Sequence, residues 1–88
     1  MSTPDFHFPV NLDTLTTDPR ELWDWGQILD YERPVPDLCP SVRKALADYA
    51  RTRARAIQAR LAGDLTRAGD YERVCRRLYA SLPQQYQW

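Results

Sequence analysis

Apolar residues recur along most of this chain at three- and four-residue spacing, the pattern of helices with one buried face. That pattern predicts a short helix over residues 18–30 and a long helix over residues 41–68. A third helix is predicted over residues 70–82, antiparallel to the second, because Gly69 suits the left-handed position that ends a helix. The predicted fold class is therefore all-α: a short helix plus a long antiparallel helical hairpin in a single small domain.

The helix boundaries rest on local signals. Asp18 offers a capping oxygen, Pro19 suits the first helical position, and Glu21 follows at the third. Gly63 lies inside the long second helix, where it costs about 1 kcal/mol relative to alanine. A break at Gly63, with Asp64 capping a new helix, is the alternative to one continuous helix.

The segments outside the helices have patterns of their own. Residues 1–17 are a predicted extended arm, because apolar and polar positions alternate over residues 6–13. Pro9 has no N–H for a sheet ladder, so the arm either lies along the helices or adds to another chain as an edge strand. Residues 31–40 hold three prolines and form a predicted stiff linker, and residues 83–88 form a tail. The apolar positions of the arm are Phe6, Phe8, Val10 and Leu12.

The segment 61–82 resembles part of a tetratricopeptide repeat. Leu61-Ala62 matches a leucine and a small residue in that family's first helix, and Gly69-Asp70-Tyr71 matches its interhelical turn. Val74 stands where the family prefers alanine, and further departures fall at Gln58 and Ser81. The motif occurs once, whereas a solenoid needs about three repeats. The resemblance therefore implies a single helical hairpin and carries over no functional residue.

Composition excludes several classes of protein. The 88 residues are 43% apolar and 27% charged, which fits one globular domain with a modest core. No run approaches the roughly 20 apolar residues that span a bilayer, and no signal-peptide pattern is present, so no membrane contact and a cytoplasmic location are expected. Cys39 and Cys75 are expected to be free thiols. With His7 as the sole histidine and no phosphate-binding glycine loop, we expect no metal site, no cofactor and no enzymatic activity.

Charge is unevenly distributed along the chain. Twelve basic and twelve acidic side chains give a formal net charge of zero. Residues 1–40 hold eight carboxylates and two arginines, a charge of −6, whereas residues 41–88 hold ten cations and four carboxylates, a charge of +6. Three interpretations stay open: the acidic front packs on the basic hairpin, one face meets a charged protein, or the hairpin binds nucleic-acid phosphates.

Arg53 departs from the other cations of the hairpin. It projects between Leu46 and Ile57, inside the apolar stripe of the second helix. A buried arginine needs a carboxylate partner. We expect a structural ion pair between Arg53 and Glu21 or Asp24 of the first helix, or the C-terminal carboxylate, which would anchor the acidic front to the hairpin.

Six cations of the hairpin project away from the apolar stripes and predict an exposed basic row: Lys44, Arg51, Arg55, Arg73, Arg76 and Arg77. Three aromatic residues also fall off the stripes, and tryptophan and tyrosine serve either as interface anchors or as fillers of a small core. The candidate partner-binding residues are Trp23, Arg51, Arg55, Arg73, Arg76, Arg77, Tyr86 and Trp88.

These features favour a non-catalytic protein-binding accessory or inhibitor-type protein, with a nucleic-acid-binding accessory protein as the alternative. Eleven of the twelve basic residues are arginine, a bias that a GC-rich genome would also produce. Together with the small size and the lack of catalytic groups, this bias leads us to expect a protein that a phage or mobile element encodes. The partner would be a host protein or a second copy of the chain. A homodimer is an open hypothesis, because the predicted second helix outreaches its neighbours.

Overall fold

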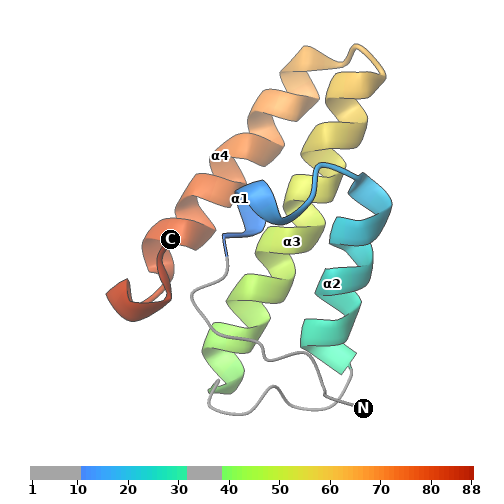
Figure 1. Ribbon diagram of the computed structural model, residues 1–88. Coiled ribbons are helices and arrows are strands. Elements are labelled where there is room, and N and C mark those ends of the chain that lie inside the picture. Colours follow the sequence, from blue (N-terminus) through green and yellow to red (C-terminus); the bar gives the residue numbers. More distant parts are fainter. Residues whose placement is uncertain (1–10, 32–38) are drawn as a thin grey trace.

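The structure is a computed structural model that describes residues 11–31 and 39–88 (Figure 1). Its elements, in chain order, are α1 (Leu12–Leu15), α2 (Pro19–Tyr31), α3 (Pro40–Leu61), α4 (Leu65–Ser81) and the single 3₁₀ turn η1 (Gln84–Tyr86). The described residues contain no strand. The predicted all-α class is therefore confirmed, together with a hairpin of two long packed helices.

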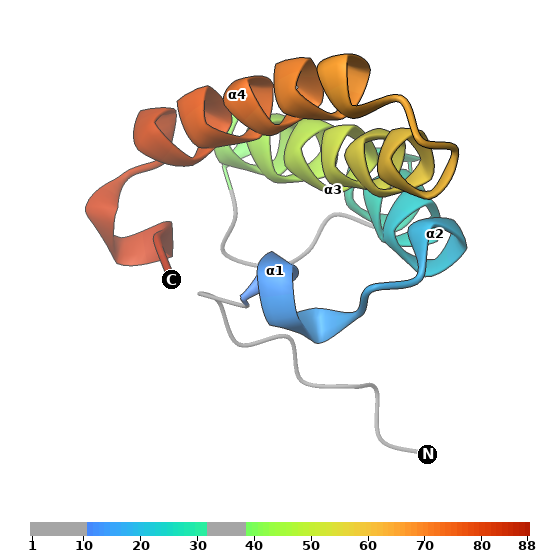
Figure 2. The same cartoon turned by 90° about the horizontal axis from the view of Figure 1, so that it is seen from above.

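Helix α3 is the centre of the fold. It packs against α2 on one side and against α4 on the other, while α1 lies over a third side of α3 (Figures 1 and 2). The buried cluster draws on all four helices and on Leu82, the residue that follows α4. Its members are Leu12, Leu29, Val42, Leu46, Ala47, Tyr49, Ala50, Cys75 and Leu82.

Polar caps fix where the helices begin. The backbone N–H of Arg20 donates to the carboxylate of Asp18 over 2.9 Å, which confirms the predicted start of α2. The N–H of Arg67 donates to Asp64 over 3.1 Å in the same way at the start of α4. Gly63 has φ +81°, in the left-handed region that glycine adopts without strain. The hairpin turn therefore lies at residues 62–64.

The predicted boundaries of the hairpin need correction. The second helix does not run over 41–68: it ends at Leu61, and the next begins at Leu65 instead of residue 70. The break at Gly63 that was the alternative is confirmed, and Gly69 lies inside α4. The Gly69-Asp70-Tyr71 turn on which the tetratricopeptide resemblance rested is thus helical here.

The N-terminal arm is also corrected in part. Residues 12–15 form α1 instead of extended chain, because the side chain of Asn11 accepts the N–H of Asp13 over 2.9 Å and caps a short helix. Leu12, the last of the four alternating apolar positions, is buried at 1% exposure. Phe6, Phe8 and Val10 lie outside the described residues, as does the linker segment 32–38.

The apolar stripe of α3 is covered within one chain. Val42, Leu46, Ala50 and Ala54 are each at most 5% exposed. A second subunit is therefore not required to cover this stripe, contrary to the length argument that favoured a dimer. Among the described residues, the large apolar side chains with more than half of their surface exposed are Leu61 and Leu65, next to the hairpin turn.

Gly26 lies where α2 and α3 are closely packed, and it gives a first prediction. A Cβ at this buried position would lie 2.6 Å from Cγ of Arg51 and 3.2 Å from the carbonyl oxygen of Ala47. We expect Gly26→Ala to lower the free energy of unfolding by about 1–2 kcal/mol through overpacking, in spite of alanine's better helix propensity. Urea unfolding followed by circular dichroism measures the change.

Gly69→Ala is the matched control for that variant. Gly69 also lies inside a helix, but nothing surrounds its would-be Cβ within 4 Å. Alanine should therefore raise stability there by about 0.5–1 kcal/mol. A Gly26→Ala protein that gains as much as Gly69→Ala would contradict the close-packing account.

Candidate partner-binding cleft

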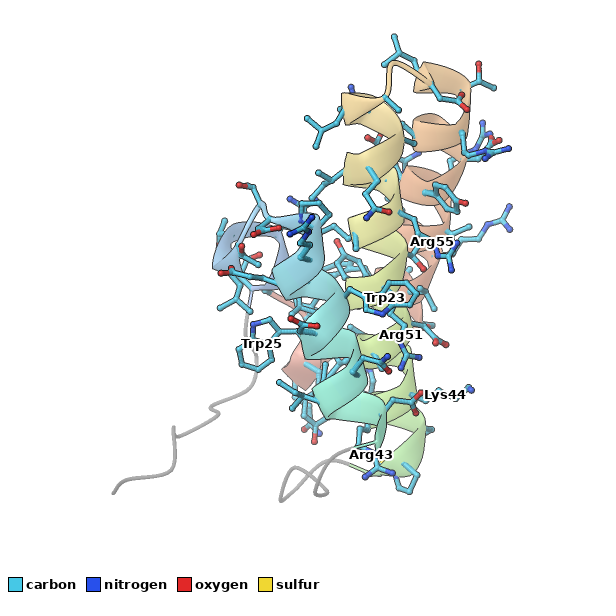
Figure 3. The ribbon with its side chains drawn as sticks, turned by 90° about the vertical axis from the view of Figure 1, so that its right-hand side faces the viewer. Trp23, Trp25, Arg43, Lys44, Arg51 and Arg55 are labelled. Atoms are coloured by element: carbon cyan, nitrogen blue, oxygen red, sulfur yellow. The ribbon has the colours of Figure 1, made fainter. Side chains whose placement is uncertain are left out.

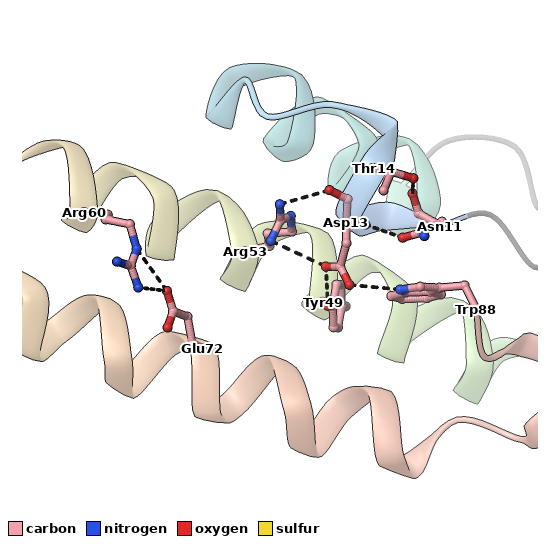
Figure 4. A network of polar contacts seen from close by, with 8 residues as sticks. All are labelled: Asn11, Asp13, Thr14, Tyr49, Arg53, Arg60, Glu72 and Trp88. Atoms are coloured by element: carbon pink, nitrogen blue, oxygen red, sulfur yellow. Dashed lines mark hydrogen bonds and ion pairs between the residues drawn. The ribbon is translucent and has the colours of Figure 1, made fainter.

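Asp13 is the centre of a polar network that joins distant parts of the chain (Figure 4). Its carboxylate accepts the Tyr49 hydroxyl over 2.6 Å and the Trp88 indole N–H over 3.0 Å. A guanidinium nitrogen of Arg53 lies 3.5 Å from the same carboxylate, and another donates to the Asp13 backbone carbonyl over 3.1 Å. Burial of Tyr49, together with its hydrogen bond to Asp13, raises the pKa of the phenol. One side chain of α1 therefore ties α3 and the C-terminal residue together.

This network corrects the predicted partner of Arg53. The front segment is anchored to the hairpin, but through Asp13 and not through Glu21 or Asp24. Glu21 instead accepts the hydroxyl of Thr16 over 2.6 Å, close to the start of α2. Asp24 is exposed and forms no ion pair within the described residues.

The C-terminal tail folds back onto the hairpin. The Trp88 ring meets Tyr49 and Tyr79 edge-on, with ring centroids 5.0 and 4.9 Å apart. The Tyr79 hydroxyl donates to the main-chain oxygen of Trp88, which belongs to the C-terminal carboxylate, and the Gln87 side-chain amide donates to the carbonyls of Tyr79 and Leu82. Tyr86 and Trp88 are both partly buried against the core, so neither is a free-standing aromatic anchor.

Between α3 and α4, beside this network, the surface is hollowed into two adjoining pockets of about 370 and 400 Å³. They share Asp13, Tyr49 and Arg76, and we call them together the α3–α4 cleft. The cleft thus joins two of the residues predicted to bind a partner, Arg76 and Trp88. Its other lining residues are Arg53, Ala56, Ile57, Arg60, Glu72, Cys75 and Tyr79.

Most charge in the cleft is used internally. Arg60 donates to Glu72 from Nε over 3.2 Å and from a terminal nitrogen, and Arg53 is paired with Asp13. Arg76 is exposed and has no ion pair within the part of the chain that the structure describes. Among the side chains that line the cleft, the one charge without an ion pair is therefore the Arg76 guanidinium group.

Cys75 forms part of the cleft floor. It is buried, and desolvation raises the pKa of its thiol from 9.0 to about 11. Cys39 is exposed, and a hydrogen bond with the Ser41 hydroxyl, 3.3 Å from its sulfur, lowers the pKa of that thiol. Both cysteines are free in the structure.

We therefore expect the two thiols to react at different rates. A disulfide reagent at about pH 8 should modify Cys39 within the mixing period and Cys75 only as the protein unfolds, because the thiolate is the reactive form. Cys39→Ser should abolish the fast phase and Cys75→Ser the slow one. Equal rates for both thiols in the folded protein would contradict the burial of Cys75.

The same pKa shift predicts how stability changes with pH. The unfolded Cys75 thiol ionises near 9.0, whereas the folded one retains its proton up to about 11. The folded state therefore binds more protons in this window, and the free energy of unfolding falls as pH rises from 9 to 11. Cys75→Ser should therefore make the free energy of unfolding depend less steeply on pH in this range. Some dependence should remain in that variant, because the pKa of Tyr49 is also raised in the folded state and acts in the same direction.

The predicted residues Trp23, Arg51 and Arg55 meet at the seam of α2 and α3 (Figure 3). The guanidinium carbons of Arg55 and Arg51 lie 5.2 and 5.9 Å from the centre of the Trp23 ring. Arg51 does not face solvent as predicted: it pairs with Asp30 over 2.9 Å and donates to Gln27 over 2.8 Å. Arg55 is exposed and has no ion pair among the described residues.

The predicted cations of α4 are all exposed but differ in their surroundings. Arg73 pairs with Asp70 one turn earlier on the same helix. Arg77 has no ion pair within the described residues and lines neither pocket of the cleft. Val74, between them, is 41% exposed.

Among the described residues, the opposite charges of residues 1–40 and of the hairpin pair with one another only in part. Two ion pairs there join the front to the hairpin, Arg51–Asp30 and Arg53–Asp13. Three more lie within the hairpin itself. The described cations that have no ion pair there are Arg20, Arg43, Lys44, Arg55, Arg76 and Arg77.

Comparison with protein-family models, curated proteins and solved structures gives no match to this chain. None of the described helices combines the length and apolar character that a membrane crossing needs. Within residues 11–31 and 39–88, no group of three or more cysteine, histidine or carboxylate side chains comes together to hold a metal ion.

Proposed function

We propose that this chain is a non-catalytic protein-binding accessory or inhibitor-type protein that binds a partner through its α3–α4 hairpin. The observation that supports this most is the one-sided packing of α4. Of its 17 residues only Ala68 and Cys75 are buried. Its uncovered sides present Leu65, 64% exposed, and Val74 among exposed arginines.

A protein fits this surface better than a nucleic acid. Exposed apolar side chains gain from contact with apolar protein surface, whereas a phosphate backbone offers them little. Asp70 and Glu72 also neutralise two of the nearby arginines, which reduces attraction for phosphates. Binding of nucleic acid by the remaining cations, Arg76 and Arg77 above all, is the alternative function that the same surface allows.

The partner we propose is a host protein, met in the cytoplasm by a protein of phage or mobile-element origin. Self-association is the second possibility, because Leu61 and Leu65 at the hairpin turn are 78% and 64% exposed. Sedimentation equilibrium of the purified chain measures it directly, and a concentration-independent monomer mass would leave a heterologous partner.

Affinity capture with a charge-reversal variant tests the function. The chain is immobilised and exposed to a nuclease-treated lysate, and a captured protein is identified, purified and titrated. We expect Arg73→Glu/Arg76→Glu/Arg77→Glu to weaken its affinity by about tenfold or more, and Lys44→Glu on α3 to change it by less than about twofold. The proposal would be refuted if the unsubstituted chain, the triple charge-reversal variant and Lys44→Glu bound the partner with equal affinity. Binding that requires intact nucleic acid would refute it as well.

A further inference from the structure

We infer that the α3–α4 cleft is a binding site for a partner segment in which an apolar side chain is followed by a carboxylate. Arg76 would bind the carboxylate, and the aromatic wall of Tyr49, Tyr79 and Trp88 would pack against the apolar side chain. This inference rests on the proposed protein-binding function, and it names the site and the chemistry of the partner.

The carboxylate preference follows from which polar groups of the cleft are already engaged. The two side-chain carboxylates that line it are each bound to an arginine of this chain, Asp13 to Arg53 and Glu72 to Arg60. Asp13 also accepts hydrogen bonds from Tyr49 and Trp88, so it has little capacity left for a ligand cation. Arg76 lines both pockets, is exposed, and has no ion pair within the described residues.

The apolar preference follows from the rest of the lining. The Trp88 ring is held edge-to-face against both Tyr49 and Tyr79, and hydrogen bonds fix the polar atoms of all three residues. Their ring carbons therefore form a wall whose shape is set before a ligand arrives, which lowers the entropic cost of binding. Ala56 and Ile57 extend this apolar lining along α3.

Arg76 and Arg77 provide a matched pair for the test. They are neighbours on α4, both exposed and both without an ion pair among the described residues, but only Arg76 lines the cleft. Arg76→Gln and Arg77→Gln remove the same charge and keep a hydrogen-bonding side chain. Both exposed substitutions are compatible with folding, which circular dichroism verifies.

The probe is a capped peptide of about eight residues with a central Phe-Glu pair among glycine and serine, so that no terminal charge contributes. It is titrated into nitrogen-15-labelled protein, and the indole N–H signal of Trp88 is followed by NMR. We expect a dissociation constant of about 0.1–1 mM, weakened about five- to tenfold in Arg76→Gln and less than about twofold in Arg77→Gln. Peptides with Phe→Ser or Glu→Gln should bind as weakly as the Arg76→Gln protein binds the parent peptide.

Several outcomes would overturn the inference. These are a Trp88 signal that does not move, an equal loss in both arginine variants, or tighter binding of a single-stranded oligonucleotide through Arg76. The proposed function fails separately. A captured partner whose affinity is insensitive to Arg76→Gln, but is lost in the triple charge reversal, would keep the protein-binding function and remove this site.

Discussion

Leu46→Ala should lower the free energy of unfolding by about 3 kcal/mol, the largest single loss that we expect in this chain. Leu46 is 0% exposed and lies in the part of α3 that belongs to the main buried cluster. Truncation removes the burial of three carbons and leaves a cavity that the neighbouring helices cannot fill without moving. For a chain of this size the loss is a large fraction of the total stability.

Leu61→Ala is the control on the same helix. Its side chain is 78% exposed, so the same substitution should change stability by less than about 0.5 kcal/mol. Thermal and urea unfolding of the two variants, measured in one buffer, test the difference. Similar losses in both would contradict the placement of the core on the Leu46 face of α3.

The features of the fold that were predicted correctly are those that strong local sequence signals determine. Asp18 and Pro19 both mark a helix start, and α2 begins at Pro19. The stripe that holds Leu46 repeats often enough along α3 to indicate its buried face. Such features are determined by neighbours within one or two turns, and the sequence contains them directly.

The position of the hairpin turn was misplaced for a physical reason. The sequence contains two Gly-Asp pairs, Gly63-Asp64 and Gly69-Asp70, and either can end one helix and cap the next. The choice depends on which register of α4 buries Ala68 and Cys75 against α3. That is a tertiary property, so helix periodicity alone cannot decide it.

In the candidate site, too, local signals identified single residues, whereas the contacts between distant residues could not be predicted. Arg76 and Trp88 could be selected as partner-binding residues from their positions off the apolar stripes, but nothing local indicated that they line one cleft. Asp13 was missed as an organising residue, because its side-chain partners Tyr49 and Trp88 are 36 and 75 residues away. The capping residue Asn11 was the available signal for α1, although it indicates a helix and not those long-range contacts.

Asp13→Ala should produce the second largest loss, about 2–3 kcal/mol. It leaves the Tyr49 hydroxyl, the Trp88 indole N–H and the Arg53 guanidinium without their common acceptor in partly buried positions. The ion pair itself contributes little to this figure, because the Asp13 side chain is 41% exposed and solvent screens the charge. Most of the cost comes from polar groups that are left unpaired.

Arg53→Met separates the ion pair from the hydrogen bonds. Methionine cannot use the Asp13 carbonyl or carboxylate but fills similar apolar space, so we expect a smaller loss, about 1 kcal/mol. The double variant should lose less than the sum of the two single variants, because both remove one shared contact. Strict additivity in urea unfolding, or a stability in Arg53→Met at or above that of the unsubstituted chain, would show that Arg53 does not anchor α1.

Since Tyr49 and Trp88 also form the wall of the α3–α4 cleft, Asp13→Ala should in addition shift the Trp88 indole N–H signal and broaden it. Stability and the shape of the cleft thus depend on the same carboxylate.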